Sequence, residues 1–194
     1  NKLGFGGKMC IDGTRKFEEE TDERYEFKVQ SSKFDFFTTQ FPAIKQVNFS
    51  LLQKEIPVLI ISVEKNRKGH LRELHQQICE LKEVESIMMI LYVEHTVDAN
   101  DLPVALWRFC NNLDPKRDNE LVQRLSKIDS SKTFACMGLD GTIKTKEVDN
   151  FQRDWPNIIV SDDETMKSVD EKWNKLGLGD FVPSPSLKYK GQMY

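Results

Sequence analysis

The fold is decided by residues 86–118, which read SIMMILYVEHTVDANDLPVALWRFCNNLDPKRD. Residues 87–93 are apolar without a break, the pattern of a strand buried on both faces of a parallel sheet. A polar corner follows at residues 94–96, and either Asp98 or Asn100 then caps a helix. Pro103 suits the first turn of that helix, where a missing N–H costs nothing. We therefore expect a buried strand and a helix that ends before Asp114-Pro115.

The flanking sequence repeats this alternation of strand and helix. In chain order, we expect an edge strand at 47–49, a strand at 57–63, a helix at 70–82, the opening strand and helix, a further helix at 119–125, a polar loop at 126–132, a strand at 134–139 and a last helix at 163–176, capped by Ser161-Asp162 and stopped by Gly177. Strands joined by helices pair in parallel, with the helices covering the sheet. The predicted fold class is α/β, a three-layer unit with a mainly parallel or mixed sheet flanked by helices.

Composition sets the broad class of protein. The chain has 194 residues, 39% of them hydrophobic and 30% charged, which suits one domain with appendages. A net charge of −3 argues against a general binder of nucleic acid or of membrane surfaces. No apolar run approaches the roughly 20 residues that span a bilayer. We expect a cytoplasmic protein with no signal peptide and no membrane span.

The spacing of the cysteines and histidines matches no metal-binding motif. The four cysteines, at positions 10, 79, 110 and 136, include no CxxC pair, and we interpret them as reduced, buried thiols. The three histidines, at positions 70, 75 and 95, lack the spacing of a zinc helix. We therefore predict no metal-binding residues.

Two glycine-containing segments suggest an internal repeat. The residues Met, Asp, Gly, Thr and Lys recur at one constant offset in residues 9–16 and 137–144. A repeat is the preferred explanation over chance, and the chain then starts near the end of a first unit. Both a fragment of a longer protein and a processed natural N-terminus fit this start. Residues 4–7 lack the Lys-Ser/Thr of a P-loop, and we interpret them as a plain loop.

The second copy also invites comparison with phosphotransferases. Asp140-Gly141-Thr142 at a strand end resembles the haloacid-dehalogenase motif D-x-D-G-T, whose first Asp is the nucleophile. Gly138 stands at that nucleophile position, which rejects the phosphatase interpretation. We expect instead that Asp140 caps a turn and that Gly141 supplies its unusual backbone angles.

Four polar residues follow the central strand: Glu94, His95, Asp98 and Asp101. The carboxyl end of a strand is where α/β sheets usually place ligands. The cluster fits a metal or acid–base site, but helix capping and solvation explain the acids equally well, and we prefer that structural interpretation.

A second charged group closes the opening stretch. Asp114, Arg117 and Asp118 have the charges to hold an anion. The preferred interpretation is that Arg117 is a tether, its guanidinium bridging carboxylates and backbone carbonyls to fix the turn.

Taken together, these motifs resemble the C-terminal region of the UbiD-like (3-octaprenyl-4-hydroxybenzoate carboxy-lyase type) decarboxylases. The matching residues, in chain order, are Phe41-Pro42, Gly69-His70, Asp101, Trp107, Asn112, Asp114-Pro115, Arg117-Asp118, Gly138 to Thr142 with Lys144, and Arg153 to Pro156. The resemblance covers about residues 41–179 and includes the earlier copy of the repeat. It implies a preceding repeat's tail and charged connector at 1–36, a UbiD-like C-terminal α/β domain that is a second, duplicated copy at 37–179, and a flexible tail at 180–194.

The resemblance also implies what the chain lacks. Enzymes of this family decarboxylate aromatic or unsaturated acids with prenylated FMN, a divalent metal and potassium, all held with the catalytic Arg and Glu by an N-terminal flavin domain. No segment here matches that domain. His95 and Thr96 also dilute an acidic run that the family often carries.

The sequence thus predicts a non-catalytic scaffold or assembly domain of an oligomeric decarboxylase. We expect no catalytic, cofactor-binding or metal-binding residues in this chain. Its partners are expected to be the flavin domain of the same parent chain and further copies of itself. The motif residues are then structural: Trp107, Asn112, Asp114, Arg117, Asp118, Asp140 and Lys144. The alternative is a regulatory α/β domain that binds a small ligand or a metal.

Overall fold

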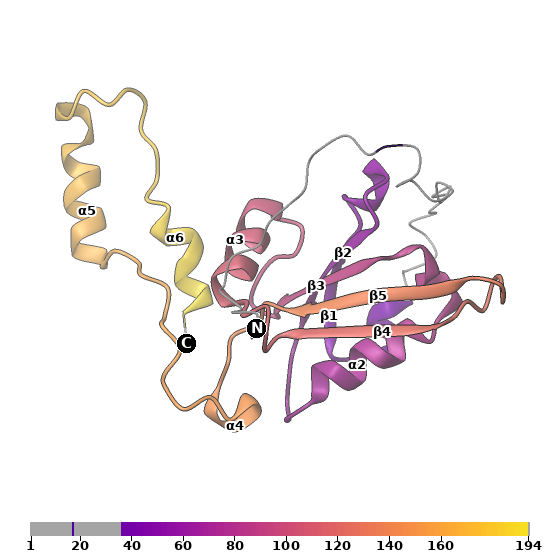
Figure 1. The fold of residues 1–194 in the computed structure, drawn as a ribbon. Coiled ribbons are helices and arrows are strands. Elements are labelled where there is room, and N and C mark those ends of the chain that lie inside the picture. The colour runs from indigo at the N-terminus through magenta and orange to yellow at the C-terminus, as the bar shows by residue number, and fades with distance from the viewer. Residues whose placement is uncertain (1–16, 18–35, 194) are drawn as a thin grey trace. The chain divides into compact units, whose positions relative to one another are not determined.

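The computed structural model describes residue 17 and residues 36–193 (Figure 1). The first copy of the repeat, the glycine-rich segment at 4–7 and the cysteine at position 10 lie outside these residues, so the repeat stays a prediction. Contacts divide the chain into two units, Asn1–Arg153 and Asp154–Tyr194, which we describe separately. Among the described residues, no helix combines the length and apolar character needed to cross a membrane.

The first unit is built on a five-stranded mixed sheet. Its strands are β1 (Ile44–Asn48), β2 (Val58–Val63), β3 (Met89–Glu94), β4 (Asn119–Leu125) and β5 (Thr133–Asp140), in the spatial order β1-β2-β3-β5-β4 (Figure 1). The central strands β2, β3 and β5 are parallel, and β1 and β4 pair antiparallel at the two edges. This confirms the predicted α/β class with a mixed sheet flanked by helices.

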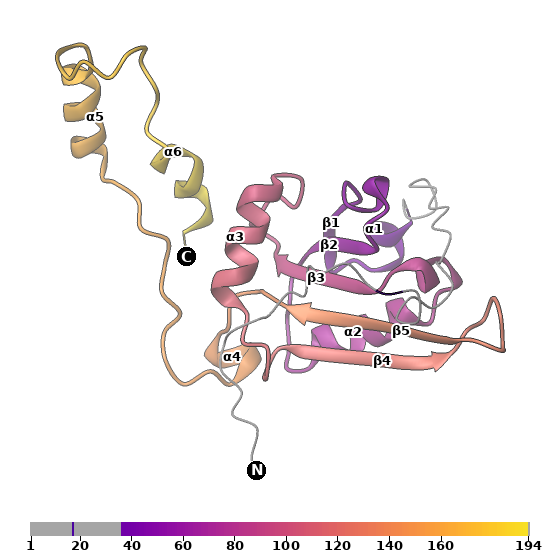
Figure 2. The ribbon, with the colours of Figure 1, turned by 45° about the horizontal axis from the view of Figure 1, so that its top comes forward.

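Helices α2 (His70–Cys79) and α3 (Leu102–Asn112) supply the crossover connections between the parallel strands. Every residue of β3 after Met89 is buried, as the unbroken apolar run predicted. Helix α2 ends at Cys79, three residues earlier than expected, and the short 3-10 helix η4 (Lys82–Ser86) leads into β3. Parallel pairing therefore brings the carboxyl ends of β2, β3 and β5 to the same edge of the sheet (Figure 2).

The prediction of a helix at residues 119–125 is wrong, because this segment is the edge strand β4. Its exposure alternates residue by residue, with Glu120, Val122 and Arg124 half-buried between exposed neighbours. It pairs with β5 along its whole length, from Asn119 opposite Leu139 to Leu125 opposite Thr133. The apolar residues Leu121, Val122 and Leu125 do not alternate with polar ones, so the sequence carried no strand pattern of period two here. The polar loop predicted at 126–132 joins the two strands of this hairpin.

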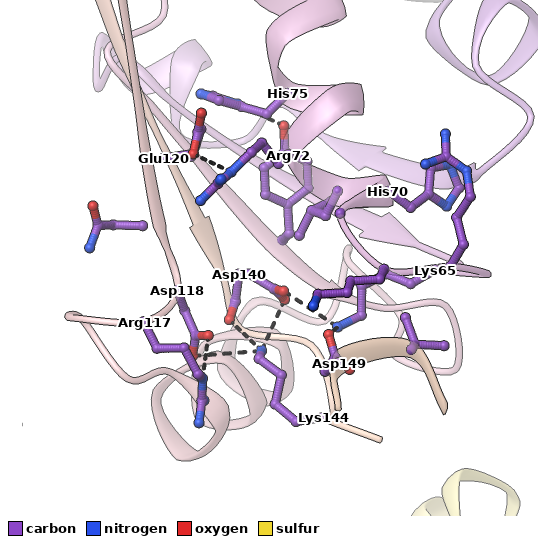
Figure 3. A pocket seen from close by; sticks show the side chains of 18 residues that line it. Lys65, His70, Arg72, His75, Arg117, Asp118, Glu120, Asp140, Lys144 and Asp149 are labelled. Carbon is purple, nitrogen blue, oxygen red and sulfur yellow. Dashed lines mark hydrogen bonds and ion pairs between the residues drawn. The ribbon is translucent and has the colours of Figure 1, made fainter. Parts of the chain in front are cut away.

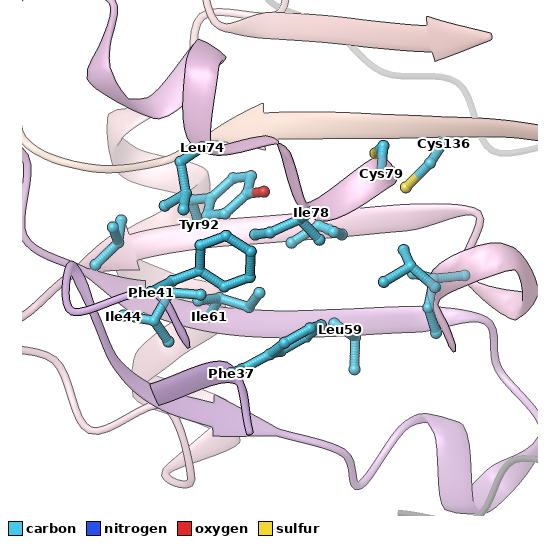
Figure 4. Close-up of a cluster of buried hydrophobic side chains, with 14 of the residues drawn as sticks. Phe37, Phe41, Ile44, Leu59, Ile61, Leu74, Ile78, Cys79, Tyr92 and Cys136 are labelled. Atoms are coloured by element: carbon cyan, nitrogen blue, oxygen red, sulfur yellow. The ribbon is translucent and has the colours of Figure 1, made fainter. Parts of the chain in front are cut away.

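One face of the sheet holds the main hydrophobic core (Figure 4). The short helix α1 (Phe37–Gln40) and helix α2 cover this face, and their buried residues pack with those of the strands. Phe37, Leu59, Ile61 and Ile78 are fully buried there. Each such side chain contributes about 1.5–3 kcal/mol of hydrophobic free energy, so this layer holds the strand ends in place.

The remaining elements are short. In the first unit they are η3 (Leu52–Lys54) and α4 (Lys146–Asp149), and in the second unit α5 (Asp163–Lys172), η5 (Trp173–Lys175), α6 (Ser186–Tyr189) and η6 (Lys190–Gln192). The predicted cap of α5 is confirmed, because the Asp162 side chain accepts from Thr165 N–H. Gly177 follows with φ = 65°, the left-handed stop that was expected. Met166 is the one buried hydrophobic residue described in this unit.

Candidate functional site

A buried ion pair occupies the carboxyl end of β3. Glu94 Oε1 accepts hydrogen bonds from Arg108 Nε at 2.7 Å and from Arg108 Nη2. Asn112 Nδ2 donates to Glu94 Oε2 at 3.3 Å and to Gly141 O at 3.1 Å. Both residues of the ion pair are 5% exposed. Glu94 therefore joins the end of β3 to helix α3, and Asn112 extends the network to the turn after β5.

The other predicted members of the ligand corner take separate positions. His95 is exposed. Asp98 Oδ1 accepts from Asn100 N–H at 2.9 Å, within the loop before α3. Asp101, rather than Asp98 or Asn100, is the N-cap of α3, where its Oδ1 accepts from Val104 N–H at 3.3 Å. These contacts are those of loop and cap residues, and a ligand role for the corner stays a prediction.

The turn after β5 is fixed by Asp140. Its Oδ1 accepts from Thr142 N–H at 2.9 Å and from the Thr142 hydroxyl, as the turn-cap interpretation expected. The expectation of unusual backbone angles at Gly141 is wrong, because its φ is not in the left-handed region. Glycine is needed there for space: a Cβ would overlap the Phe109 ring and lie 2.9 Å from Phe109 Cα.

Lys144 lies beneath this turn as a buried cation (Figure 3). Its Nζ donates to Asp140 O at 2.9 Å and Thr142 O at 2.8 Å, and forms ion pairs with Asp140 Oδ1 at 3.1 Å and Asp118 Oδ2 at 3.7 Å. Burial lowers the pKa of Lys144, against the opposing pull of the two carboxylates. The side chain thus ties the ends of β5 and of the α3–β4 connection to one point.

The turn before β4 is a second braced corner. Arg117 donates from Nε and Nη2 to the two Asp118 oxygens, each at 2.6 Å, and this raises the pKa of Arg117. Asp118 Oδ2 also accepts from Asp114 N–H at 2.8 Å. Arg117 Cζ lies 5.4 Å from the centre of the Phe151 ring. Arg117 thus binds the Asp118 carboxylate, and the predicted bridge to further carboxylates and to backbone carbonyls stays a prediction.

A cavity of about 290 Å³ opens beside these corners (Figure 3). Six cationic side chains line it: Lys65, Arg67, Lys68, Arg72, Arg117 and Lys144. Lys65 Nζ lies 2.7 Å from Asp149 Oδ1 and 3.4 Å from Asp140 Oδ2. Burial opposes ionisation of Asp140, but Lys144 and Lys65 outweigh it and lower the pKa of Asp140. Sequence reasoning missed this cavity because its residues come from four separated segments.

The motif residue Trp107 is exposed at the surface of the domain. It lies on helix α3 with 43% of its surface exposed, and Arg108 Cζ is 5.8 Å from its ring centre. The sequence marked this residue through the resemblance alone, and its exposure means that its side chain is not a core residue.

A third cluster lies deeper, between α2 and β5. His75, Cys79 and Cys136 are buried, and one potential ligand atom from each lies within 4.8 Å of the others. A hydrogen bond with the Cys136 thiol, helped by His75, lowers the pKa of Cys79 to about 6 against the effect of burial. The spacing among the histidines did not predict this cluster, although His75 and Cys79 have the i, i+4 spacing of a ligand pair. Cys110, by contrast, is exposed, so the expectation of buried thiols is wrong there.

Comparison with known proteins identifies the family. Residues 29–140 match the profile of the 3-octaprenyl-4-hydroxybenzoate carboxy-lyase C-terminal domain, UbiD_C. An uncharacterized protein of Aquifex aeolicus (strain VF5) is 27% identical over 123 residues, which are 61% of this chain and 25% of that protein. This chain therefore spans about a quarter of that relative.

Solved structures agree on the fold. The vanillic acid decarboxylase of Sedimentibacter hydroxybenzoicus in its closed form matches with a TM-score of 0.54 and 15% identity, over 76% of this chain and 31% of that one. The open form with a truncated ShVdcD matches with a TM-score of 0.51 and 17% identity, over 74% and 31% of the two chains. Since the family profile covers more than half of the sequence, the chain belongs to the family of UbiD carboxy-lyase C-terminal domains.

Proposed function

We propose that this chain is the non-catalytic scaffold and assembly domain at the C-terminal end of a UbiD-like decarboxylase of aromatic or unsaturated acids. In this proposal, prenylated FMN, a divalent metal and potassium are held by an N-terminal flavin domain of the same parent chain. The α/β domain extends over residues 37–179, and the protein works as a homo-oligomer in the cytoplasm.

One observation carries the proposal: the ionisable side chains at the strand ends are engaged within the domain. Glu94 bonds Arg108 and Asn112, and Asp140 bonds Lys144 and Thr142. A general acid, base or nucleophile needs its reactive atom directed at a substrate. Groups that brace turns in this way serve the rigidity of a platform on which other domains assemble.

The cavity of about 290 Å³ favours a second candidate, a regulatory domain that binds a small anion. Its size approaches the lower end of small-molecule pockets, and cations outnumber acids along its wall. Lys68 lines this cavity and has no carboxylate partner among the described residues, unlike Lys65 and Arg117. A carboxylate or phosphate ligand would suit that charge balance.

Calorimetry separates the two candidates. The purified chain is titrated with FMN, with benzoate-type acids and with inorganic phosphate, and its mass in solution is measured by light scattering. The scaffold proposal expects no saturable heat and a mass that is a multiple of the monomer. Saturable binding of an anion, lost in Lys68→Met and kept in the exposed-site control Lys54→Met, would favour the regulatory candidate.

A further inference from the structure

The buried cluster of His75, Cys79 and Cys136 has the donor set of a metal site. His75 and Cys79 are one helical turn apart, so their side chains leave the same face of α2. Cys136 belongs to β5, and Figure 4 shows its side chain beside that of Cys79. Two sulfurs and an imidazole form a soft set that selects zinc-like metals over magnesium or calcium.

The spacing of the donor atoms is close to what zinc requires. Bond lengths of about 2.3 Å to sulfur and about 2.0–2.1 Å to nitrogen place tetrahedral ligand atoms roughly 3.5–3.8 Å apart. The distance from His75 Nε2 to Cys79 Sγ is 3.6 Å. The largest separation in the cluster is within 4.8 Å, so zinc binding requires the donor atoms that are furthest apart to move closer together.

The imidazole ring is held in place by two neighbouring residues. His75 Nδ1 is 2.9 Å from the Tyr92 hydroxyl, the outer-shell bond that metal-binding histidines usually make with their second nitrogen. The ring packs directly over Gly138, where a Cβ would come within 2.7 Å of Nδ1. Tyr92 and Gly138 thus fix the position of the ring, and Nε2 lies 3.6 Å from Cys79 Sγ and 3.4 Å from the Cys136 carbonyl oxygen, a contact that zinc binding would replace.

The net charge of the assembled site is also suitable. Zn²⁺ with two thiolates and a neutral imidazole is an uncharged group, which a buried position tolerates better than an isolated ion. His75, Tyr92 and Gly138 also line the cavity described above, so the buried cluster adjoins that cavity.

We propose that His75 Nε2, Cys79 Sγ and Cys136 Sγ bind one Zn²⁺ ion, which clips helix α2 to strand β5. Three metal–ligand bonds form, both thiol protons pass to solvent or buffer, and a fourth position is left for water or another donor. No electron is transferred. This proposal does not rest on the scaffold function, because zinc binding is measured on this chain without any assay of assembly or decarboxylation.

Cobalt substitution tests the site under reducing conditions. The 194-residue chain, stripped of metal, is titrated with Co²⁺ to look for thiolate-to-cobalt absorption, and Zn²⁺ is then added in competition. We expect one ion per chain and displacement of cobalt by zinc. Cys79→Ser and Cys136→Ser should each weaken Zn²⁺ binding by on the order of 100-fold. The exposed Cys110→Ser is the matched control and should bind as the unsubstituted chain does.

Tyr92→Phe tests the outer shell without removing a ligand. It should weaken Zn²⁺ binding by roughly 10-fold while keeping the cobalt–thiolate absorption. Absence of that absorption in the unsubstituted chain would overturn the site, whatever the folding of the variants. Absorption that persists in a folded Cys79→Ser/Cys136→Ser double variant, or disappears in Cys110→Ser, would also overturn it.

Discussion

Glu94 and Arg108 show how much of this domain depends on single buried polar contacts. Both residues are 5% exposed, so each charged group has lost its contact with water and pairs with the other instead. Removing one partner of such a pair leaves an uncompensated charge in a medium of low polarity, which costs more than the pair itself contributes. A second residue-scale constraint is steric, where Gly141 lets the turn after β5 approach Phe109.

Arg108→Met tests the ion pair. The substitution leaves the Glu94 carboxylate with Asn112 as its remaining side-chain donor, and we expect the free energy of unfolding to fall by about 3–5 kcal/mol. Urea denaturation at neutral pH measures it. Lys45→Met, which removes the exposed pair with Glu64, is the control and should change stability by less than about 1 kcal/mol. An equal effect of the two substitutions would contradict the assigned role.

Gly141→Ala tests the close approach to Phe109. A methyl group there has no room, so we expect a loss of about 1–3 kcal/mol in the free energy of unfolding. Gly191→Ala is the matched control, because nothing lies within 4 Å of its added Cβ. A thermal melt of the two variants side by side is sufficient. A Gly141→Ala protein as stable as the control would show that the turn and α3 are not in tight contact.

At the element scale, the β4–β5 hairpin is anchored by Glu85. Its carboxylate accepts from Arg124 Nη1 at 2.5 Å, from the Ser126 hydroxyl at 2.5 Å and from Lys127 N–H at 2.6 Å. Burial opposes ionisation, but these donors outweigh it and lower the pKa of Glu85 from 4.5 to about 2. The anchor holds the loop between the strands against η4.

Glu85→Gln tests this anchor through pH. A carboxyl group with a lowered folded-state pKa contributes stability above its unfolded pKa and loses it as pH falls through the folded value. The free energy of unfolding of the unsubstituted chain should therefore exceed that of Glu85→Gln by a constant amount above about pH 4.5. This difference should shrink as the pH falls toward 2. Urea titrations at several pH values measure it, with the exposed Glu83→Gln as control. A difference independent of pH would contradict the assignment.

How well the sequence predicts each element depends on whether local residues or contacts with distant strands decide its conformation. The strand β3 (Met89–Glu94) was predictable because residues 87–93 are all apolar, whichever face each side chain occupies. The edge strand β4 was not, because Leu121, Val122 and Leu125 among polar residues also fit one face of a short helix, and only pairing with β5 decides the conformation. Propensity is weak where tertiary contacts decide.

The same distinction explains the site. Asp140 as a turn cap was predictable, because its partner Thr142 is two residues away. The partnership of Lys65 with Asp140 and Asp149 was not, since the three residues meet only after β2, β5 and α4 are assembled. His75 and Cys136 belong to this second class, since their proximity follows from α2 packing on the sheet.

At the scale of the whole molecule, the two contact units differ in their cores. The unit that ends at Arg153 contains the sheet and the main hydrophobic cluster, and the family profile at 29–140 lies within it. The unit from Asp154 onward has Met166 as its buried hydrophobic residue among those described. A segment of this size has too little core to fold stably alone.

Truncation after Arg153 tests this division. We expect chain 1–153 to keep the cooperative unfolding transition of the 194-residue chain, because its core is complete. The midpoint should change by only a few degrees. The separate segment 154–194 should show little helix by circular dichroism. Loss of cooperative unfolding in 1–153 would show that the sheet unit depends on the C-terminal residues.

Our central proposal is that the polar residues at the strand ends brace the domain and that this chain does not itself carry out decarboxylation. The most direct measurement is CO₂ release by the purified 194-residue chain supplied with prenylated FMN, Mn²⁺, K⁺ and a panel of aromatic and unsaturated acids. We predict no release above a protein-free control. Cofactor-dependent turnover that is abolished by substituting Glu94, Asp140 or Lys144 in a chain that remains folded would contradict the claim.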